Sequence, residues 1–336
     1  MNDSPDLQSS VIGLDLGTSR IVAARRRETE ILFTSQLNSF AAIPYSKITQ
    51  GVLQKERIHH LTRGSELIVF GDESERFSNL FHTETHRPMR RGILNRDEPD
   101  GAAMIRQMLL LVLGERNGRA QKVCFSVPAG SLGENASQNA HQEAIAEMLR
   151  DLNYEPCAIT EGLAAVYGEL ESSGYTGIAI SCGAGLCNVC LSYLSVPVTS
   201  FSIPKGGDYV DEAAAGERGE SVTRVRAVKE QSFAFNGHFL NKLQQSIADR
   251  YDDMIRTLVV AMKDAFAGGA NMPKLDRPLP LVLAGGSALA PGFRDRFESV
   301  LRETAFPLPI SEVRLAANPL NSTARGTLVA ALNEAA

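Results

Sequence analysis

The apolar and polar positions of this chain alternate with two different periods. Short apolar runs bounded by glycine or proline predict buried strands. We expect such strands at residues 11–16, 21–24, 122–127, 157–159, 196–203, 279–283 and 309–313. Apolar residues spaced three and four apart predict helices. We expect helices at residues 97–113, 134–152, 160–170, 208–215, 239–266, 294–302 and 323–332. Strands and helices that alternate in this way predict an α/β protein with helices flanking its sheets.

Two glycine-turned hairpins have the same layout in the two halves of the chain. In VIGLDLGTSR an apolar strand runs into a Gly-Thr-Ser turn, and in ISCGAGLCNVC a similar strand runs into a Gly-Ala-Gly turn. Residues 15–18 of the first hairpin (Asp-Leu-Gly-Thr) align with residues 181–184 of the second (Ser-Cys-Gly-Ala). This internal pseudo-repeat predicts two similar α/β halves.

The glycine turns have the chemistry of a phosphate site. Backbone amides of Gly17, Thr18 and Ser19 can point into one concavity and donate to phosphate oxygens, because glycine permits close approach. Asp15, at the mouth of the turn, can hold a hydrated magnesium ion. A further glycine-rich turn, LVLAGGSALAPGF at residues 281–293, is of the type that packs against a purine and its ribose. The three turns together predict a nucleotide site.

The cysteines of the second hairpin allow a competing hypothesis. The spacing CxxxxCxxC of Cys182, Cys187 and Cys190 could offer three thiolates to zinc, with a fourth ligand from Cys124, Cys157 or a histidine. No pair of CxxC motifs accompanies them, and they occupy apolar strand positions, where cysteine behaves as a small buried hydrophobe. We therefore interpret them as core residues, and we expect no disulfides from the five cysteines.

Composition and charge narrow the function classes. The 336 residues are 43% hydrophobic and 22% charged, as expected for a globular protein of two domains. The formal net charge of -5 gives no global positive field for nucleic acid, so we expect no nucleic-acid partner. The first ten residues are polar and acidic, unlike a secretory signal, and we expect a cytoplasmic protein. Basic runs at residues 25–27 and 87–91 could contact a membrane, but a solvated face is the favoured interpretation.

These motifs carry a resemblance to a known superfamily. The chain resembles the superfamily of actin, sugar kinases and heat-shock chaperones, and within it the bacterial actins, above all the rod-shape and magnetosome types. GLDLGTSR is similar to that family's first phosphate loop, ISCGAGLCN to its second, ITEGLAAVYG to its first connecting helix, LVLAGGSALAPGF to its adenosine loop and LNSTARGTLVAA to its second connecting helix. Residues 223–235, TRVRAVKEQSFAF, resemble its adenosine-facing helix and the strand that follows. The resemblance covers nearly the whole chain.

The resemblance implies an actin-like fold, in which two duplicated α/β domains enclose a nucleotide cleft and each carries a small inserted subdomain. Domain I would comprise residues 1–150 plus 318–336, with its small subdomain at about residues 33–86, which alternate short strands with turns. Domain II would comprise residues 151–317, with its small subdomain at about residues 207–275.

The resemblance also implies roles for single residues, with ATP or ADP and Mg²⁺ as cofactors. Asp15 would hold the water shell of the magnesium ion. The residues expected to bind the phosphates are Gly17, Thr18, Ser19 and Arg20 in the first loop and Gly183, Ala184 and Gly185 in the second. The residues expected around the ribose and the base are Arg226, Lys229, Glu230, Gly285, Gly286 and Ser287. Glu161 would stand at the hinge as a catalytic candidate.

The second phosphate loop departs from the family pattern. Ser181 replaces an aspartate that helps to position magnesium and the attacking water, and Asn188 stands where an acid is common. The residue that orients the water stays open among Glu134, Asn135 and Gln138. Loss of one orienting group typically lowers a rate by about two to four powers of ten. The sequence therefore predicts weak hydrolysis or none.

Three functional hypotheses follow. The first is a cytoplasmic actin-like protein that assembles head to tail into filaments, with ATP as the assembly switch; any adaptor protein is unknown. The second is a non-polymerising nucleotide-binding scaffold or regulator. The third, a small-molecule kinase, ranks last because the sequence offers no clear catalytic aspartate beside either phosphate hairpin.

Overall fold

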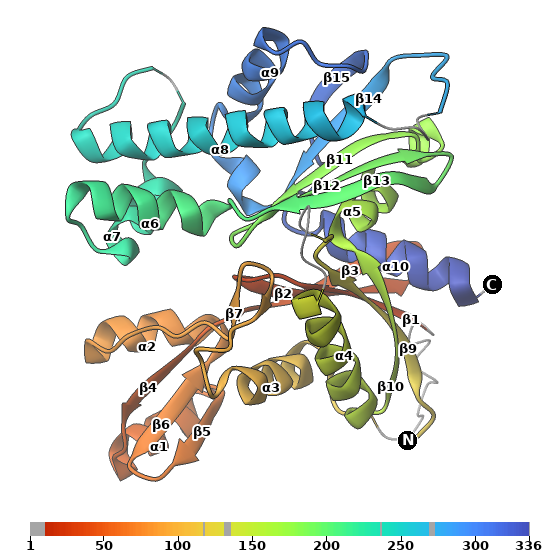
Figure 1. Cartoon of the computed structure of the whole chain (residues 1–336). Coiled ribbons are helices and arrows are strands. Elements are labelled where there is room, and N and C mark those ends of the chain that lie inside the picture. The colour runs from red at the N-terminus through yellow and green to blue at the C-terminus, as the bar shows by residue number, and fades with distance from the viewer. Residues whose placement is uncertain (1–10, 117, 131–135, 236, 269–272, 336) are drawn as a thin grey trace.

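Two five-stranded sheets with the same strand order form the centres of two lobes (Figure 1). The structure is a computed structural model that describes residues 11–116, 118–130, 136–235, 237–268 and 273–335. The first sheet has the order β10-β9-β1-β2-β3, and its strands are β1 Val11–Leu16, β2 Arg20–Arg27, β3 Glu30–Leu37, β9 Gln121–Val127 and β10 Tyr154–Thr160. The second has the order β13-β12-β11-β14-β15, and its strands are β11 Gly177–Cys182, β12 Cys187–Tyr193, β13 Val196–Ile203, β14 Leu279–Ala284 and β15 Ile310–Leu315.

The two sheets repeat one topology. In each, a hairpin and a third strand pair antiparallel, and two later strands add in parallel beside the first strand of the hairpin. The central strands are buried on both faces, which explains their continuous apolar runs. The pseudo-repeat and the α/β class expected from the sequence are confirmed.

Helices cover both faces of each sheet. They are α3 Gly101–Leu113 and α4 Ala136–Asp151 in the first lobe, α6 Gly207–Arg218, α7 Val222–Gln231, α8 Lys242–Ala267 and α9 Phe293–Glu303 in the second, and α5 Glu161–Glu169 and α10 Ser322–Ala335 between the sheets. Helix α8 begins later than the apolar pattern predicted because the Asn241 side chain caps it by accepting from Gln244 N–H. Its buried face belongs to the core of the second lobe, as expected.

Helices α5 and α10 cross in contact with each other between the two sheets (Figure 1). Small residues make this crossing possible, since a Cβ atom placed on Gly326 would overlap the carbonyl oxygen of Ala164. Gly13 of β1 similarly admits the backbone of Leu328. The lobes are therefore joined through a tightly packed pair of helices.

The region expected as a small subdomain contains two helices that the sequence analysis missed. A three-stranded sheet of order β4-β6-β5 comprises β4 Phe40–Pro44, β6 Glu66–Phe70 and β5 His60–Arg63. Helices α1 Lys47–Lys55 and α2 Ser74–Phe81 pack with it through one apolar cluster. Their short lengths carry little periodic signal. Residues 33–37 belong to β3 in the main sheet.

Smaller elements complete the described chain. A two-stranded ribbon is formed by β7 Met89–Arg90 and β8 Ile93–Leu94, and short 3₁₀ helices span Gly71–Glu73, Glu171–Ser173 and Gly286–Leu289. The strand expected after residue 231 is wrong: residues 232–235 form no strand, and Phe235 makes one backbone hydrogen bond to Pro291 O.

Among the residues that the structure describes, no helix is long and apolar enough to cross a membrane.

The hairpin cysteines occupy core positions, as the sequence indicated. Cys182 and Cys187 face each other across the hairpin and are fully buried in the core of the second lobe. Cys190 packs into a different apolar cluster on the other face of the sheet, beside α5. The three thiols therefore do not converge on one point, which removes the geometric basis for a zinc site at this hairpin.

Candidate functional site

A cavity of about 410 Å³ lies between the two lobes. Of the site residues expected from the sequence that fall within the described chain, all but Gln138 line it: Asp15, Gly17, Thr18, Ser19, Arg20, Glu161, Ser181, Gly183, Ala184, Gly185, Arg226, Lys229, Glu230, Gly285, Gly286 and Ser287. The candidates Glu134 and Asn135 lie outside the described residues. Segments that are far apart in the sequence therefore meet at one place, although their individual roles stay predictions.

The two hairpin turns at the cavity have the same hydrogen-bond geometry. Gly17 N–H donates to Arg20 O over 2.9 Å, and Gly183 N–H donates to Leu186 O over 3.0 Å. Within the described part of the chain, the amides of Thr18, Ser19, Ala184 and Gly185 have no acceptor. Each turn therefore leaves two consecutive backbone donors available to a ligand.

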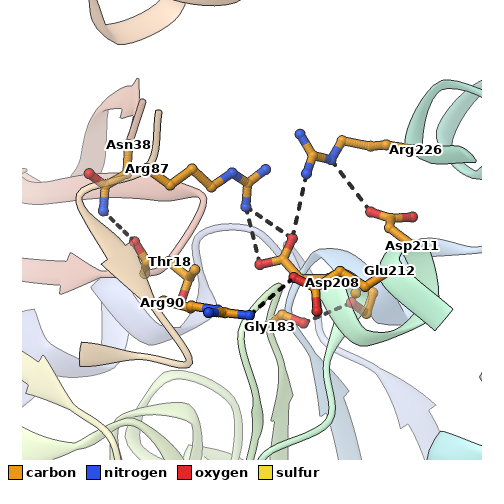
Figure 2. Close-up of polar contacts among 12 residues, drawn as sticks. Thr18, Asn38, Arg87, Arg90, Gly183, Asp208, Asp211, Glu212 and Arg226 are labelled. Atoms are coloured by element: carbon orange, nitrogen blue, oxygen red, sulfur yellow. Dashed lines mark hydrogen bonds and ion pairs between the residues drawn. The ribbon is translucent and has the colours of Figure 1, made fainter. Parts of the chain in front are cut away.

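The two turns also approach each other closely. Thr18 Oγ1 accepts a hydrogen bond of 2.9 Å from Gly92 N–H in the β7–β8 turn. A Cβ atom on Gly185 would overlap this same Thr18 oxygen. Asn38 Nδ2 donates to Gly17 O over 3.0 Å and so helps to hold the first turn in place (Figure 2). Glycine at position 185 is thus required for the close approach of the two lobes.

A pair of carboxyl groups forms the floor of the cavity. Ser126 Oγ donates to Asp15 Oδ1 over 2.7 Å and accepts from Leu16 N–H over 3.1 Å. Burial raises the pKa of Asp15 to about 6, although the Ser126 hydrogen bond opposes the rise. Burial, and then the charge of Asp15, raises the pKa of Glu161 to about 8. Two close, buried carboxyl groups of this kind disfavour joint ionisation and favour a bound cation.

The second turn presents a hydroxyl and an amide where the family pattern has acids. Ser181 lies opposite Asn188 in the β11–β12 register. Asn188 Nδ2 donates to Glu161 Oε2 over 2.6 Å, and its Oδ1 accepts from Ala129 N–H over 3.0 Å. Both ends of this amide are therefore engaged, and Asn188 orients Glu161. The sequence analysis noted the substitution at position 188 but not this contact, which depends on the strand register.

The candidate Gln138 makes a local hydrogen bond and does not reach the cavity. Its Nε2 donates to Ala129 O over 2.8 Å, and Gln138 is not among the residues that line the cavity. Glu161 does line the cavity and is 7% exposed. Of these two candidates, only Glu161 therefore has access to a ligand in the cavity.

Polar contacts between α6, α7 and the glycine-rich turns arrange the opposite end of the cavity. Lys229 Nζ donates to Gly207 O over 3.0 Å and to Asp211 Oδ2 over 2.8 Å. Burial raises the pKa of Asp211, whereas the Lys229 ammonium opposes the rise. Ser287 Oγ donates to Gly183 O over 2.8 Å and links the third glycine-rich turn to the turn of the second hairpin.

Several charged residues that line the cavity were not predicted from the sequence. Arg87 and Asp208 line it and form an ion pair in which one guanidinium nitrogen, Arg87 Nη1, lies 3.0 and 3.2 Å from the two carboxylate oxygens (Figure 2). Asp208 and Asp211 follow the Gly206-Gly207 pair at an i, i+3 spacing, which places them on one helix face. This spacing after a glycine pair was the sequence signal from which the two residues could have been predicted as site residues.

Comparisons with known proteins place this geometry among related folds. A family model described as Volactin matches residues 11–331. A structure of the MamK double helical filament is 19% identical, with a TM-score of 0.72, and the match covers 96% of this chain and 98% of that chain. MreB 5 of Spiroplasma citri, determined with AMPPNP bound, is 15% identical, with a TM-score of 0.67 and 94% of each chain covered.

A third similar structure is the ethanolamine utilization protein EutJ from Carboxydothermus hydrogenoformans. It is 18% identical, with a TM-score of 0.57, and the match covers 98% of this chain and 91% of that chain. No curated protein matches the sequence. These likenesses confirm the actin-like fold and the resemblance to bacterial actin-like proteins.

Proposed function

Because this chain belongs to the volactin family and has the actin-like fold, we propose that it is a cytoplasmic protein that binds an adenine nucleotide with Mg²⁺ between its lobes and assembles head to tail into filaments. The observation that carries the proposal is the convergence of three glycine-rich turns on one cavity. MreB 5, which has the same fold, was determined with an ATP analogue bound.

The phosphate groups would bind to the paired turns. Free amides of Thr18 and Ser19 on one side and of Ala184 and Gly185 on the other supply four donors that do not depend on side-chain identity. Helix α6 begins beside the second turn, since Gly207 N–H donates to Gly183 O. The positive end of its dipole therefore adds to the attraction for an anion.

The Asp15 and Glu161 carboxyl groups fit a magnesium ion. Both groups offer oxygen ligands, and the raised pKa values indicate that two negative charges are not balanced by the protein alone. A bound divalent cation would supply that balance and polarise the phosphate oxygens. Asp15 would hold the ion through its water shell, and Glu161, oriented by Asn188, would face the nucleotide.

We expect hydrolysis to be slow in this site. Ser181 lines the cavity but has no carboxylate with which to orient a water molecule or to hold the hydrated cation from the second lobe. The pKa of Glu161 is raised to about 8, so the residue is a proton donor rather than a base at neutral pH until a cation ionises it. Nucleotide binding therefore depends on the backbone, whereas turnover depends on side chains that this chain has lost.

Filament assembly is the part of the proposal that needs a direct test. MamK, which has the same fold, forms a double helical filament. Contacts between unlike ends of a subunit do not close on themselves and so propagate. Sedimentation and light scattering of the purified protein at micromolar concentration, with ATP, with ADP and without nucleotide, should show assembly that depends on nucleotide.

The same assay distinguishes filament assembly from the second candidate function, a non-polymerising nucleotide-binding scaffold. A protein that binds nucleotide but stays monomeric under all three conditions would be a non-polymerising scaffold, and the filament proposal would fail.

A further inference from the structure

Ion pairs bridge the mouth of the nucleotide cavity, and the proposed function leaves them unexplained. Arg87 lies in the first lobe between α2 and β7, whereas Asp208 lies in the first turn of α6 in the second lobe. Their side chains meet across the gap (Figure 2). Both residues line the cavity. We infer that Arg87 and Asp208 form a clasp that holds the lobes closed over bound nucleotide and limits the rate of its release.

Further charges extend this clasp on both sides. Arg226 of α7 lies 3.8 Å from Asp208 and 3.9 Å from Glu75 of α2. Arg90 of β7 lies 3.9 Å from Glu212 of α6. Among the described residues these make three ion pairs that cross between the lobes, and Asp208 lies within ion-pair distance of one guanidinium from each lobe. The charges alternate in sign along the mouth, which favours closure over repulsion.

The clasp lies far from the helix pair α5 and α10 that would act as the hinge between the lobes. The lobes are joined by the crossing of α5 and α10, which pack against each other between the sheets. The clasp residues lie on α2, α6 and α7 and beside β7, away from this crossing (Figure 1). A hinge opening at the helix pair would separate Arg87 from Asp208 before a ligand could leave past them.

The Arg87–Asp208 pair is also better placed to contribute energy than an ordinary surface pair. The two side chains are 19% and 23% exposed, so solvent screens them less than the fully exposed pairs whose contribution is near zero. Both carboxylate oxygens accept from Arg87 Nη1, and charge-assisted hydrogen bonds of this kind are roughly twice as strong as neutral ones. Asp208 is held in place because its N–H donates to Ala184 O over 2.8 Å.

This inference rests on the proposed nucleotide binding, so the experiment measures binding first. Fluorescent methylanthraniloyl-ATP with Mg²⁺ is bound to the full chain, and its release is followed by stopped flow after addition of excess ATP. The variants are Arg87→Met, Asp208→Asn and the double variant. Arg256→Met is the matched control, because Arg256 pairs with Asp252 and Glu303 within the second lobe.

We expect each single variant to release the analogue about tenfold faster than the wild type, which corresponds to about 1.4 kcal/mol. The double variant should release it no faster than either single variant, since the first substitution already removes the shared interaction. Arg256→Met should leave the rate unchanged. High NaCl concentration should speed release from the wild type more than from Asp208→Asn.

Other outcomes overturn the inference in distinguishable ways. Single variants with the wild-type release rate would show that the pair carries no closing energy. A double variant whose acceleration is the product of the two single effects would mean that Arg87 and Asp208 contact the nucleotide independently. A wild type that does not bind the analogue would end both the clasp and the proposed function. If Arg87→Met does not fold by circular dichroism, Arg87→Lys, which keeps the charge but loses the planar guanidinium, carries the test with an expected intermediate rate.

Discussion

Replacement of Glu161 by glutamine should stabilise the nucleotide-free protein at alkaline pH. Glu161 is 7% exposed, and burial followed by the charge of Asp15 raises the pKa of its carboxyl group from 4.5 to about 8. A carboxyl group with a higher pKa in the folded protein than in the unfolded chain keeps its proton on folding. The folded state then binds more protons than the unfolded state, so stability falls as pH rises from about 4.5 through about 8.

The size of this effect follows from the shift itself. One pKa unit corresponds to about 1.4 kcal/mol, so the full rise corresponds to about 5 kcal/mol, and relaxation around the ionised group reduces this to about 2–4 kcal/mol. Glu161→Gln keeps an oxygen acceptor for Asn188 but cannot ionise. From about pH 5 to about pH 8, the wild type should therefore lose about 2–4 kcal/mol of unfolding free energy relative to the variant.

Urea unfolding monitored by circular dichroism, with EDTA and without nucleotide, measures the difference at each pH. Equal m-values in both proteins would show that the unfolded states are comparable. Glu147→Gln, at an exposed position of α4, is the control and should follow the wild type. Parallel pH profiles for the wild type and Glu161→Gln would refute the idea that a buried, charge-coupled carboxyl group forms the cavity floor. Saturating Mg²⁺ and ADP should remove the difference, because a cation stabilises the ionised carboxylate.

Two further substitutions test the hinge and the second turn. Gly326→Ala should destabilise the protein by about 3 kcal/mol or more, because the new methyl group would overlap Ala164 O. The control is Gly216→Ala, on α6 with open space around it, which should be neutral or stabilising by up to about 1 kcal/mol. Similar unfolding free energies for both variants would contradict the packed crossing. Ser181→Asp should raise phosphate release from ATP by about a hundredfold or more, with Ser181→Ala as the control. An unchanged rate would mean that position 181 does not limit turnover.

The strands and glycine turns could be predicted from sequence because their signals are local. An apolar run followed by glycine determines a strand and its turn within about ten residues, and the two hairpins have the predicted layout. The repeated motif then located the cavity, since Gly17 and Gly183 adopt the same turn in equivalent sheets. Helices α1 and α2 were missed because short amphipathic segments between strands resemble turns.

The polar network of the site could not be predicted because it depends on register and on contacts between lobes. Asn188 reaches Glu161 only because the β11–β12 register and the position of α5 bring them together. Arg87 and Asp208 are 121 residues apart in sequence, and the basic run around Arg87 was interpreted as a solvated face. Lys229, expected at the ribose, is bound to Asp211 and Gly207, which a helical pattern alone cannot indicate.

The substitution at position 181 has a second consequence, which makes its test more discriminating. Asp15 and Glu161 already place two acidic groups at the cavity floor, and each raises the cost of ionising another. A third carboxylate at position 181, opposite the neutral Asn188, would line the same cavity as these two groups without a cation to balance it. Ser181→Asp should therefore lower stability in EDTA and recover it with Mg²⁺ and nucleotide, whereas Ser181→Ala should do neither. A gain in turnover without this dependence on Mg²⁺ would mean that the added carboxylate acts on the water alone and not on the cation.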